Sequence, residues 1–310
     1  MKKIIYLALL IFTILTAKAQ ETQKLQLDWL NQNAVSLDSD YLSKIKTGTV
    51  VGLGEASHGT EEFFREKNKI VKYLIKNQNY TQIGFEFTDT EIEKINQYVL
   101  TGKGDLKVLM DDFRLYKTQS FFDLFEWIKN YNNTSKVKIE VFGFSKIDFT
   151  DPYTRDSLMA ECIIEKQVKT KAKTVAWSHN LHLARNSTMA GINGLGQHLK
   201  NYFGSDYYNI AFDTYQGTVN TLRFLEDGSF KIESHKLELP AKNFTQLFSE
   251  VKFSNFYIYL RQDSPLSGFK NSITNIWADW RAPYALPVKL TDDFDAVIFI
   301  KNTSSSIMLK

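Results

Sequence analysis

An acid and a histidine lie three residues apart between glycines in the stretch GLGEASHG, residues 52–59. Glu55 and His58 follow a short apolar run, and a helical pattern begins directly after them. A carboxylate in this position can orient an imidazole as a general base, or both side chains can bind a metal ion. The stretch lacks the Lys-Ser/Thr ending of a phosphate-binding loop, and Ser57 lacks the flanking glycines of a nucleophile elbow. We therefore expect acid–base or metal chemistry here.

More polar side chains occur within or directly after the other predicted strands. Glu86 stands between two phenylalanines in an apolar run, where an unpaired carboxylate would be costly. It should meet a cation such as Lys67, meet backbone amides, or orient a histidine. His179 and His182 are three residues apart in SHNLH, which places both on one side of a helical turn. The motif alone is weak, but three of the five histidines fall at two neighbouring strand ends.

The helix predicted over residues 60–77 carries a lysine on its apolar side. A projection at about 100° per residue places Lys67 in the middle of the apolar stripe. A lysine buried there costs several kcal/mol unless it meets an acid or lines a wet cleft, and a snorkelling side chain is the alternative. The stripe consists of Phe63, Phe64, Ile70, Val71 and Leu74.

Short apolar runs alternate with helical patterns along the chain, which predicts a three-layer α/β fold with a mainly parallel central sheet flanked by helices. In such a sheet the ligand cleft lies at the carboxyl ends of the strands, where the acids and histidines described above would meet. Two runs near 218–237 predict a hairpin at one edge of the sheet. The predicted strands are 48–54, 81–87, 138–144, 174–178, 207–213, 218–225, 256–261 and 294–301. The predicted helices are about 60–77, 89–100, 104–112, 119–131, 153–170, 192–203 and 243–250.

The first nineteen residues have the order of a cleaved secretory signal, with two lysines, an apolar run and then Ala-Lys-Ala. The run is too short to span a bilayer comfortably, so we expect residues 20–310 to be exported to the periplasm or the exterior as one domain. Removing three lysines leaves 35 basic against 35 acidic residues. This neutral balance gives no reason to expect nucleic acid or an anionic membrane as a partner. The single cysteine, Cys162, cannot form an internal disulfide.

Five blocks of the chain, in order, resemble the erythromycin esterase family. The resemblance implies a small-molecule ester or lactone as the substrate and a shortened helical cap over residues 88–136. Less cap means less surface to enclose a large macrocycle. The blocks are GLGEASHGTEEFFREKNKIVKYLI at 52–75, IGFEF at 83–87, FFDLFEWIKNYN at 121–132, VAWSHNLHLAR at 175–185 and FDAVIFIKNTS at 294–304.

The same resemblance implies a hydrolase without a cofactor that opens an ester with an activated water and forms no acyl-enzyme. His58 is similar in position to the general base of the family. Glu55 and Glu86 resemble the acids that hold and polarise that base. His179 and His182 resemble partners for the substrate carbonyl or the leaving alkoxide.

The residues expected to bind the substrate are Lys67, Asn180 and His182. Lys67 stands where the antibiotic-inactivating members of the family typically have arginine, nine residues after the base. Lys67, Asn180 and His179 are candidate donors to the oxyanion, and His182 completes the substrate-binding set.

Two other functions remain open from the sequence. The first is a metal-dependent hydrolase or peptidase that uses the same histidines and glutamates as ligands for a divalent metal. The second is a protein without catalytic activity that binds haem or a small metabolite through the histidines.

Overall fold

The computed structural model describes residue 18 and residues 20–146, 148–238 and 240–310. The predicted secretory signal lies outside these residues apart from Lys18. None of the helices in the described part of the chain has the length and hydropathy needed for a membrane span.

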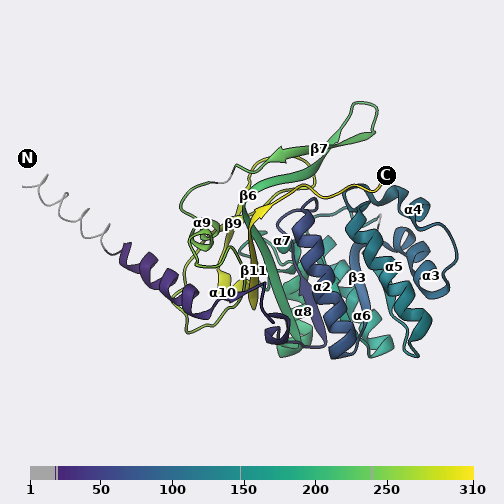
Figure 1. Cartoon of the computed structure of the whole chain (residues 1–310), viewed down its shortest axis with the longest axis horizontal. Coiled ribbons are helices and arrows are strands. Elements are labelled where there is room, and N and C mark those ends of the chain that lie inside the picture. Colours follow the sequence, from purple (N-terminus) through teal and green to yellow (C-terminus); the bar gives the residue numbers. More distant parts are fainter. Residues whose placement is uncertain (1–17, 19, 147, 239) are drawn as a thin grey trace, which may run out of the picture.

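Among the described residues, nine strands form a central sheet in the order β1-β8-β11-β6-β2-β5-β3-β4, with β7 paired to β6 alone (Figure 1). Neighbouring strands from β11 to β4 run parallel, and β8 and β1 complete one edge as antiparallel strands. The strands are β1 (Val35–Ser36), β2 (Val50–Leu53), β3 (Tyr80–Thr88), β4 (Glu140–Ser145), β5 (Lys173–Trp177), β6 (Tyr207–Phe224), β7 (Phe230–Lys236), β8 (Asn255–Tyr259) and β11 (Ala296–Thr303). A separate two-stranded sheet pairs β9 (Asn271–Thr274) with β10 (Ala285–Val288).

Helices connect the parallel strands and cover both faces of the sheet. They are α2 (Glu61–Gln78), α3 (Asp89–Thr101), α4 (Leu106–Leu109), α5 (Gln119–Thr134), α6 (Arg155–Thr170), α7 (Asn180–Leu183), α8 (Leu195–Phe203), α9 (Phe244–Ser249) and α10 (Leu290–Asp293). Short 3₁₀ helices are η1 (Leu42–Lys44), η2 (Asp111–Tyr116) and η3 (Gly204–Asp206), and residues 20–33 are also helical.

Alternate residues of the strands face opposite layers, as the pleat of a sheet requires. Val51 joins the core formed with α2, α3 and α5, whereas Val50 joins the core formed with α6 and α8. Both faces of these strands are therefore apolar, and the predicted three-layer α/β class is confirmed. The polar residues that follow the strands are left at the carboxyl edge.

Two predictions about individual elements were wrong. The runs 207–213 and 218–225 belong to one strand, β6, and the hairpin that it forms with β7 projects from this central strand rather than from an edge of the sheet (Figure 1). The helix predicted over 104–112 consists of α4 followed by the 3₁₀ helix η2. The predicted cap segment, 88–136, contains α3, α4, η2 and α5, and its role as a cap stays a prediction.

Gly217 lies where strand β6 changes its pairing partner from β11 to β7. It is the last residue of β6 paired with β11, opposite Thr303, and the following residues pair with β7. Its φ of 127° is open to glycine but not to other residues without strain, and a Cβ there would overlap the carbonyl group of Thr303. Gly217 therefore marks the point at which β6 passes from pairing with β11 to pairing with β7 within one continuous strand.

We predict that Gly217→Ala lowers the free energy of unfolding by about 1–3 kcal/mol or more, because strain and overlap add. Urea unfolding of the variant measures this change. Gly228→Ala is a suitable control, since Gly228 also has a positive φ but nothing lies within 4 Å of a Cβ there. A loss at Gly217 no larger than the loss at Gly228 would contradict the role of Thr303.

Candidate active site

The carboxylate of Glu55 is buried directly after β2 and is fully hydrogen-bonded. Its Oε1 accepts from His58 Nδ1 at 2.8 Å and from the Tyr116 hydroxyl at 2.6 Å. Its Oε2 accepts from Lys67 Nζ at 2.6 Å and from Trp177 Nε1 at 3.0 Å. Burial opposes ionisation, but the Lys67 ammonium and His58 outweigh it and lower the pKa of Glu55 to about 2. Glu55 is therefore a permanent negative charge at neutral pH.

Lys67 balances that charge from inside the protein. Its side chain is 0% exposed, which confirms the inward orientation predicted from the helical projection. The ammonium also lies 4.4 Å from the ring centroid of Trp177. Burial lowers the pKa of Lys67 to about 8, although Glu55 opposes this shift. With no exposed surface, Lys67 meets Glu55 in this structure, and its expected contact with a substrate stays a prediction.

The two ring nitrogens of His58 have different surroundings. Nδ1 faces Glu55, and Nε2 is turned away from Glu55. Nδ1 faces Glu55 Oε1, so the proton of the neutral ring is assigned to Nδ1. Nε2 then keeps its lone pair, as a general base requires. The side chain is 17% exposed, so solvent reaches the ring.

His179 lies beside His58, with the two ring centroids 5.2 Å apart. Its Nδ1 accepts the backbone N–H of Leu181 at 3.2 Å, which assigns the ring proton to Nε2. In the described part of the chain this buried Nε2 has no hydrogen-bond partner. Burial, together with the nearby His58 and His182, lowers the pKa of His179 to about 3, so the ring is a neutral donor.

A second network surrounds Glu86 on β3. Its Oε1 accepts from Arg155 at 3.0 Å, and its Oε2 accepts from the Ser178 hydroxyl at 2.5 Å. His182 Nε2 lies 3.3 Å from the same Oε1, and its Nδ1 lies 2.9 Å from Asp156. Glu86 meets Arg155 and His182 rather than Lys67, which was the other cation considered from the sequence.

Protonation in this second network follows from the charges around each group. Burial opposes ionisation of Glu86, but His182 and Arg155 hold its pKa well below the usual range. Burial also disfavours a charged His182, yet Glu86 and Asp156 raise its pKa to about 10. His182 is therefore a cation at neutral pH, in contrast to the neutral His179 three residues earlier.

The side-chain amide of Asn180 forms hydrogen bonds with the backbone of β6. Its Nδ2 donates to Phe212 O at 2.8 Å, and its Oδ1 accepts from Phe212 N at 3.1 Å. The amide is completely buried, and a Cβ on Gly54 would overlap its oxygen. Asn180 therefore fixes α7 against the sheet, and its expected contact with an oxyanion stays a prediction.

The structure thus brings Glu55, His58 and His179 together, with Lys67 beneath them and the Glu86–His182 network alongside. Sequence reasoning missed five partners: Tyr116, Arg155, Asp156, Trp177 and Ser178. Trp177 and Ser178 are the last two residues of a predicted strand, and their side chains could have been noticed there. Arg155 and Asp156 begin α6, ten residues after β4 ends at Ser145, so they do not stand at a strand end.

No group of three or more His, Cys, Asp or Glu side chains among the described residues is arranged to hold a metal ion. The oxygens of Glu55 and Glu86 already accept hydrogen bonds from protein donors, and a metal would have to displace these donors.

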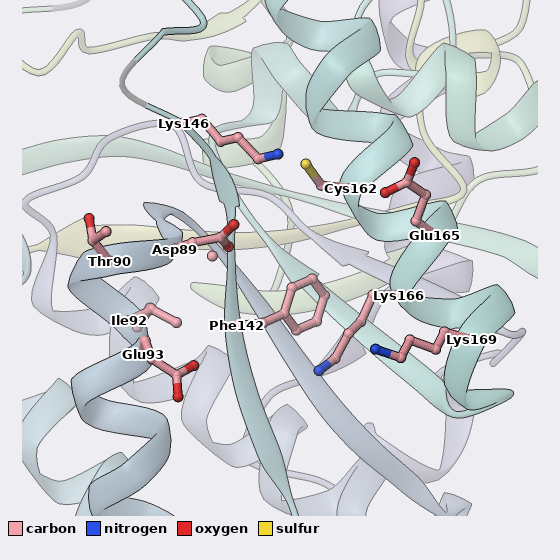
Figure 2. A pocket seen from close by; sticks show the side chains of 11 residues that line it. Asp89, Thr90, Ile92, Glu93, Phe142, Lys146, Cys162, Glu165, Lys166 and Lys169 are labelled. Atoms are coloured by element: carbon pink, nitrogen blue, oxygen red, sulfur yellow. The ribbon is translucent and has the colours of Figure 1, made fainter.

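A cleft of about 540 Å³ lies away from these networks, between α3 and α6 beside the edge strand β4 (Figure 2). Phe142 forms its floor, with Asp89 on one wall and Lys166 on the other. Its lining, within the described ranges, includes neither His58 nor His182.

The comparison with protein families gives a match over most of the chain. The family model described as erythromycin esterase matches residues 75–153 and 145–303. Erythromycin esterase type II from Escherichia coli is 30% identical over 94 residues, which cover 30% of this chain and 22% of that protein. The candidate hydrolase YbfO from Bacillus subtilis is 29% identical over 125 residues, which cover 37% of this chain and 28% of that protein. The aligned stretches span less than a third of both relatives.

Solved structures share the fold over nearly the whole chain. A Bacillus cereus protein has a TM-score of 0.82 at 21% identity, covering 93% of this chain and 99% of that chain. A mutant of the erythromycin esterase EreC in its open conformation has a TM-score of 0.68 at 15% identity, covering 85% of this chain and 93% of that chain.

We predict that Lys67→Met lowers the free energy of unfolding by about 3–5 kcal/mol, because it leaves the buried charge of Glu55 unbalanced. Lys69→Met is the matched control on the same helix, since Lys69 pairs with Glu66 but is 53% exposed. The control should change stability by about 1 kcal/mol at most. Urea unfolding of both variants decides the point, and equal losses would contradict a dependence on burial.

The raised pKa of His182 predicts a dependence of stability on pH. Its contribution is complete below about pH 6.5, its ordinary pKa, and is lost as pH rises toward the folded value of about 10. The stability difference between the wild type and His182→Gln should therefore shrink by up to a few kcal/mol between pH 6 and pH 10. Lys67 titrates in both proteins, so its contribution cancels. A difference that stays constant with pH in urea unfolding would show that His182 is not held as a cation.

Proposed function

The chain belongs to the erythromycin esterase family, and we propose that it hydrolyses a carboxylic ester or lactone with a water molecule activated by His58. The observation that carries the proposal is that, among the described residues, Nε2 of His58 is turned away from Glu55 and lies beside a buried His179 whose Nε2–H has no partner. A base and a hydrogen-bond donor on adjacent rings are what direct attack of water on a carbonyl requires.

The proposed reaction begins when His58 Nε2 removes a proton from water as the water oxygen bonds to the carbonyl carbon. The imidazolium that forms is stabilised by Glu55, whose pKa of about 2 keeps it from taking the proton itself. The C–O bond to the alcohol then breaks, and the proton passes from His58 to the leaving alkoxide. Water thus adds across the ester without an acyl-enzyme.

His179 is proposed to stabilise the negative charge that develops on the carbonyl oxygen. Its Nε2–H is buried and free, so it would donate to the oxyanion without first breaking a bond in the described protein. Its low pKa, about 3, keeps the ring neutral, so it does not compete with His58 for the proton.

Glu86 is proposed to fix the position of His179 rather than to act as a base. Its Oε2 lies 3.3 Å from the backbone nitrogen of His179 and accepts from Ser178. Arg155 and His182 neutralise its charge. The network would hold the β5–α7 junction, and with it the donor, at a fixed distance from His58.

The substrate is proposed to be a small ester or lactone. Between α3 and α5 the described chain has the short elements α4 and η2, and η2 carries Tyr116 beside His58. A substrate that is incompletely enclosed fits this arrangement better than one that needs a deep lid. Export through residues 1–19 stays part of the proposal, so this substrate would be met outside the cytoplasm.

We predict that His58→Ala reduces turnover of the best substrate in a panel of esters and lactones at least ~100-fold, as loss of a general base does. His198→Ala is the control, because His198 lies on α8 outside both networks. The wild type should keep its activity after treatment with a chelator. A His58→Ala variant that retains activity, or a wild type that turns over nothing in the panel, would refute the proposal.

A further inference from the structure

The hydroxyl of Tyr116 touches both members of the Glu55–His58 pair. It lies 2.6 Å from Glu55 Oε1 and 2.5 Å from His58 Nδ1. Its ring lies between aromatic side chains, with centroids 5.6 Å from Phe64 and 5.0 Å from Phe87. The hydroxyl is therefore held beside Nδ1 of His58, whereas the proposed basic atom of that ring is Nε2.

The orientation of this hydroxyl follows from its neighbours. Burial and the negative charges of Glu55 and Glu86 raise the pKa of Tyr116 well above its usual value, so the phenol keeps its proton. His58 Nδ1 carries its own hydrogen, so the phenol proton is donated to the carboxylate. The oxygen lone pairs of Tyr116 then face the N–H of His58.

The C-terminal residues of the chain tie Tyr116 to the loop that carries His58. Leu309 N donates to Lys117 O at 2.9 Å, next to Tyr116. A few residues earlier, Ser306 N donates to Gly59 O at 2.9 Å, next to His58. The two sides of the site are thus joined by one short segment, although Tyr116 and His58 are far apart in the sequence.

We propose that Tyr116 is a positioning residue that stabilises the positive charge which His58 acquires when it removes the proton of water. The proposal rests on the function proposed above for His58. A proton gained at Nε2 spreads positive charge to Nδ1–H, which faces both Glu55 Oε1 and the phenol oxygen. Glu55 supplies a full negative charge, and Tyr116 supplies the negative end of a dipole.

The hydroxyl also fixes the carboxylate. It occupies one lone pair of Glu55 Oε1 while Lys67 and Trp177 hold Oε2, so the plane of the carboxylate is set on both sides. The Oε1 lone pair that receives His58 stays aimed at Nδ1. This arrangement lowers the reorganisation needed when His58 becomes charged.

Other charged or titratable groups face His58 from every element around it. All of them remain in place when only the hydroxyl is removed, so Tyr116→Phe isolates its contribution. These groups are Glu55, Lys67 on α2, Glu86 on β3, His179 after β5 and His182 on α7.

Tyr41→Phe is a matched control for Tyr116→Phe. Tyr41 is also buried and donates to a glutamate, Glu66, at 2.7 Å, but it does not contact His58. We expect Tyr116→Phe to lower kcat about tenfold with little change in KM, as loss of a hydrogen bond to a charged group would. The acid limb of the pH profile of kcat/KM should move to lower pH by about half a unit, because the charged ring is less stabilised. Tyr41→Phe should leave both quantities unchanged.

An experiment without substrate separates this inference from the proposed reaction. NMR titration of ¹³C-histidine-labelled protein follows the Cε1–H of His58, which is assigned by its absence in His58→Gln. A lower titration midpoint in Tyr116→Phe than in the wild type and Tyr41→Phe supports the role of the hydroxyl, even if no ester is hydrolysed. The proposed role of Tyr116 is overturned if the titration midpoint of His58 in Tyr116→Phe equals or exceeds that in the wild type. It is also overturned if the acid limb of the kcat/KM profile does not move in this variant.

Discussion

The ionised carboxylate of Glu55 is the group on which the arrangement of the site depends. An anion without access to water must be neutralised and hydrogen-bonded by the protein itself. In the described chain its donors come from four separate segments: the loop after β2, helix α2, the 3₁₀ helix η2 and strand β5. A shift of any of these segments would leave part of a buried charge unsatisfied, so one carboxylate fixes their relative positions.

His179 and His182 differ because their surroundings separate their pKa values. His179 is buried beside other imidazoles, which keeps it neutral. His182 lies between two carboxylates and is held as a cation. His58 has its Nδ1 on Glu55. Rings of the same type can thus take different electrostatic roles in one site.

The parts of the fold with regular periodicity could be predicted from the sequence. Alternation of apolar residues located most strands, and the helical projection placed Lys67 inside. The pairing between elements could not be predicted in this way. Glu86 could have met Lys67 or another cation, and only the packing of α6 shows that Arg155 takes this place. The sequence likewise did not indicate that Asn180 would both donate to and accept from the backbone of Phe212.

Tyr116 was the hardest residue to foresee. It ends a short 3₁₀ helix in which Arg114 has a φ of 50°, so the segment has no helical or strand period. Its place beside His58 is set by tertiary contacts, including those with the C-terminal residues of the chain. Sequence periodicity does not predict the positions of catalytic or binding residues in irregular segments, because tertiary packing determines those positions.

We propose that Glu55 fixes the proton of neutral His58 on Nδ1 and leaves Nε2 able to act as the base. The ¹⁵N chemical shifts of the His58 ring, measured near neutral pH in ¹⁵N-histidine-labelled protein, report the position of this proton. We expect a protonated Nδ1 and an unprotonated Nε2. A proton on Nε2 in the neutral ring would contradict this proposal.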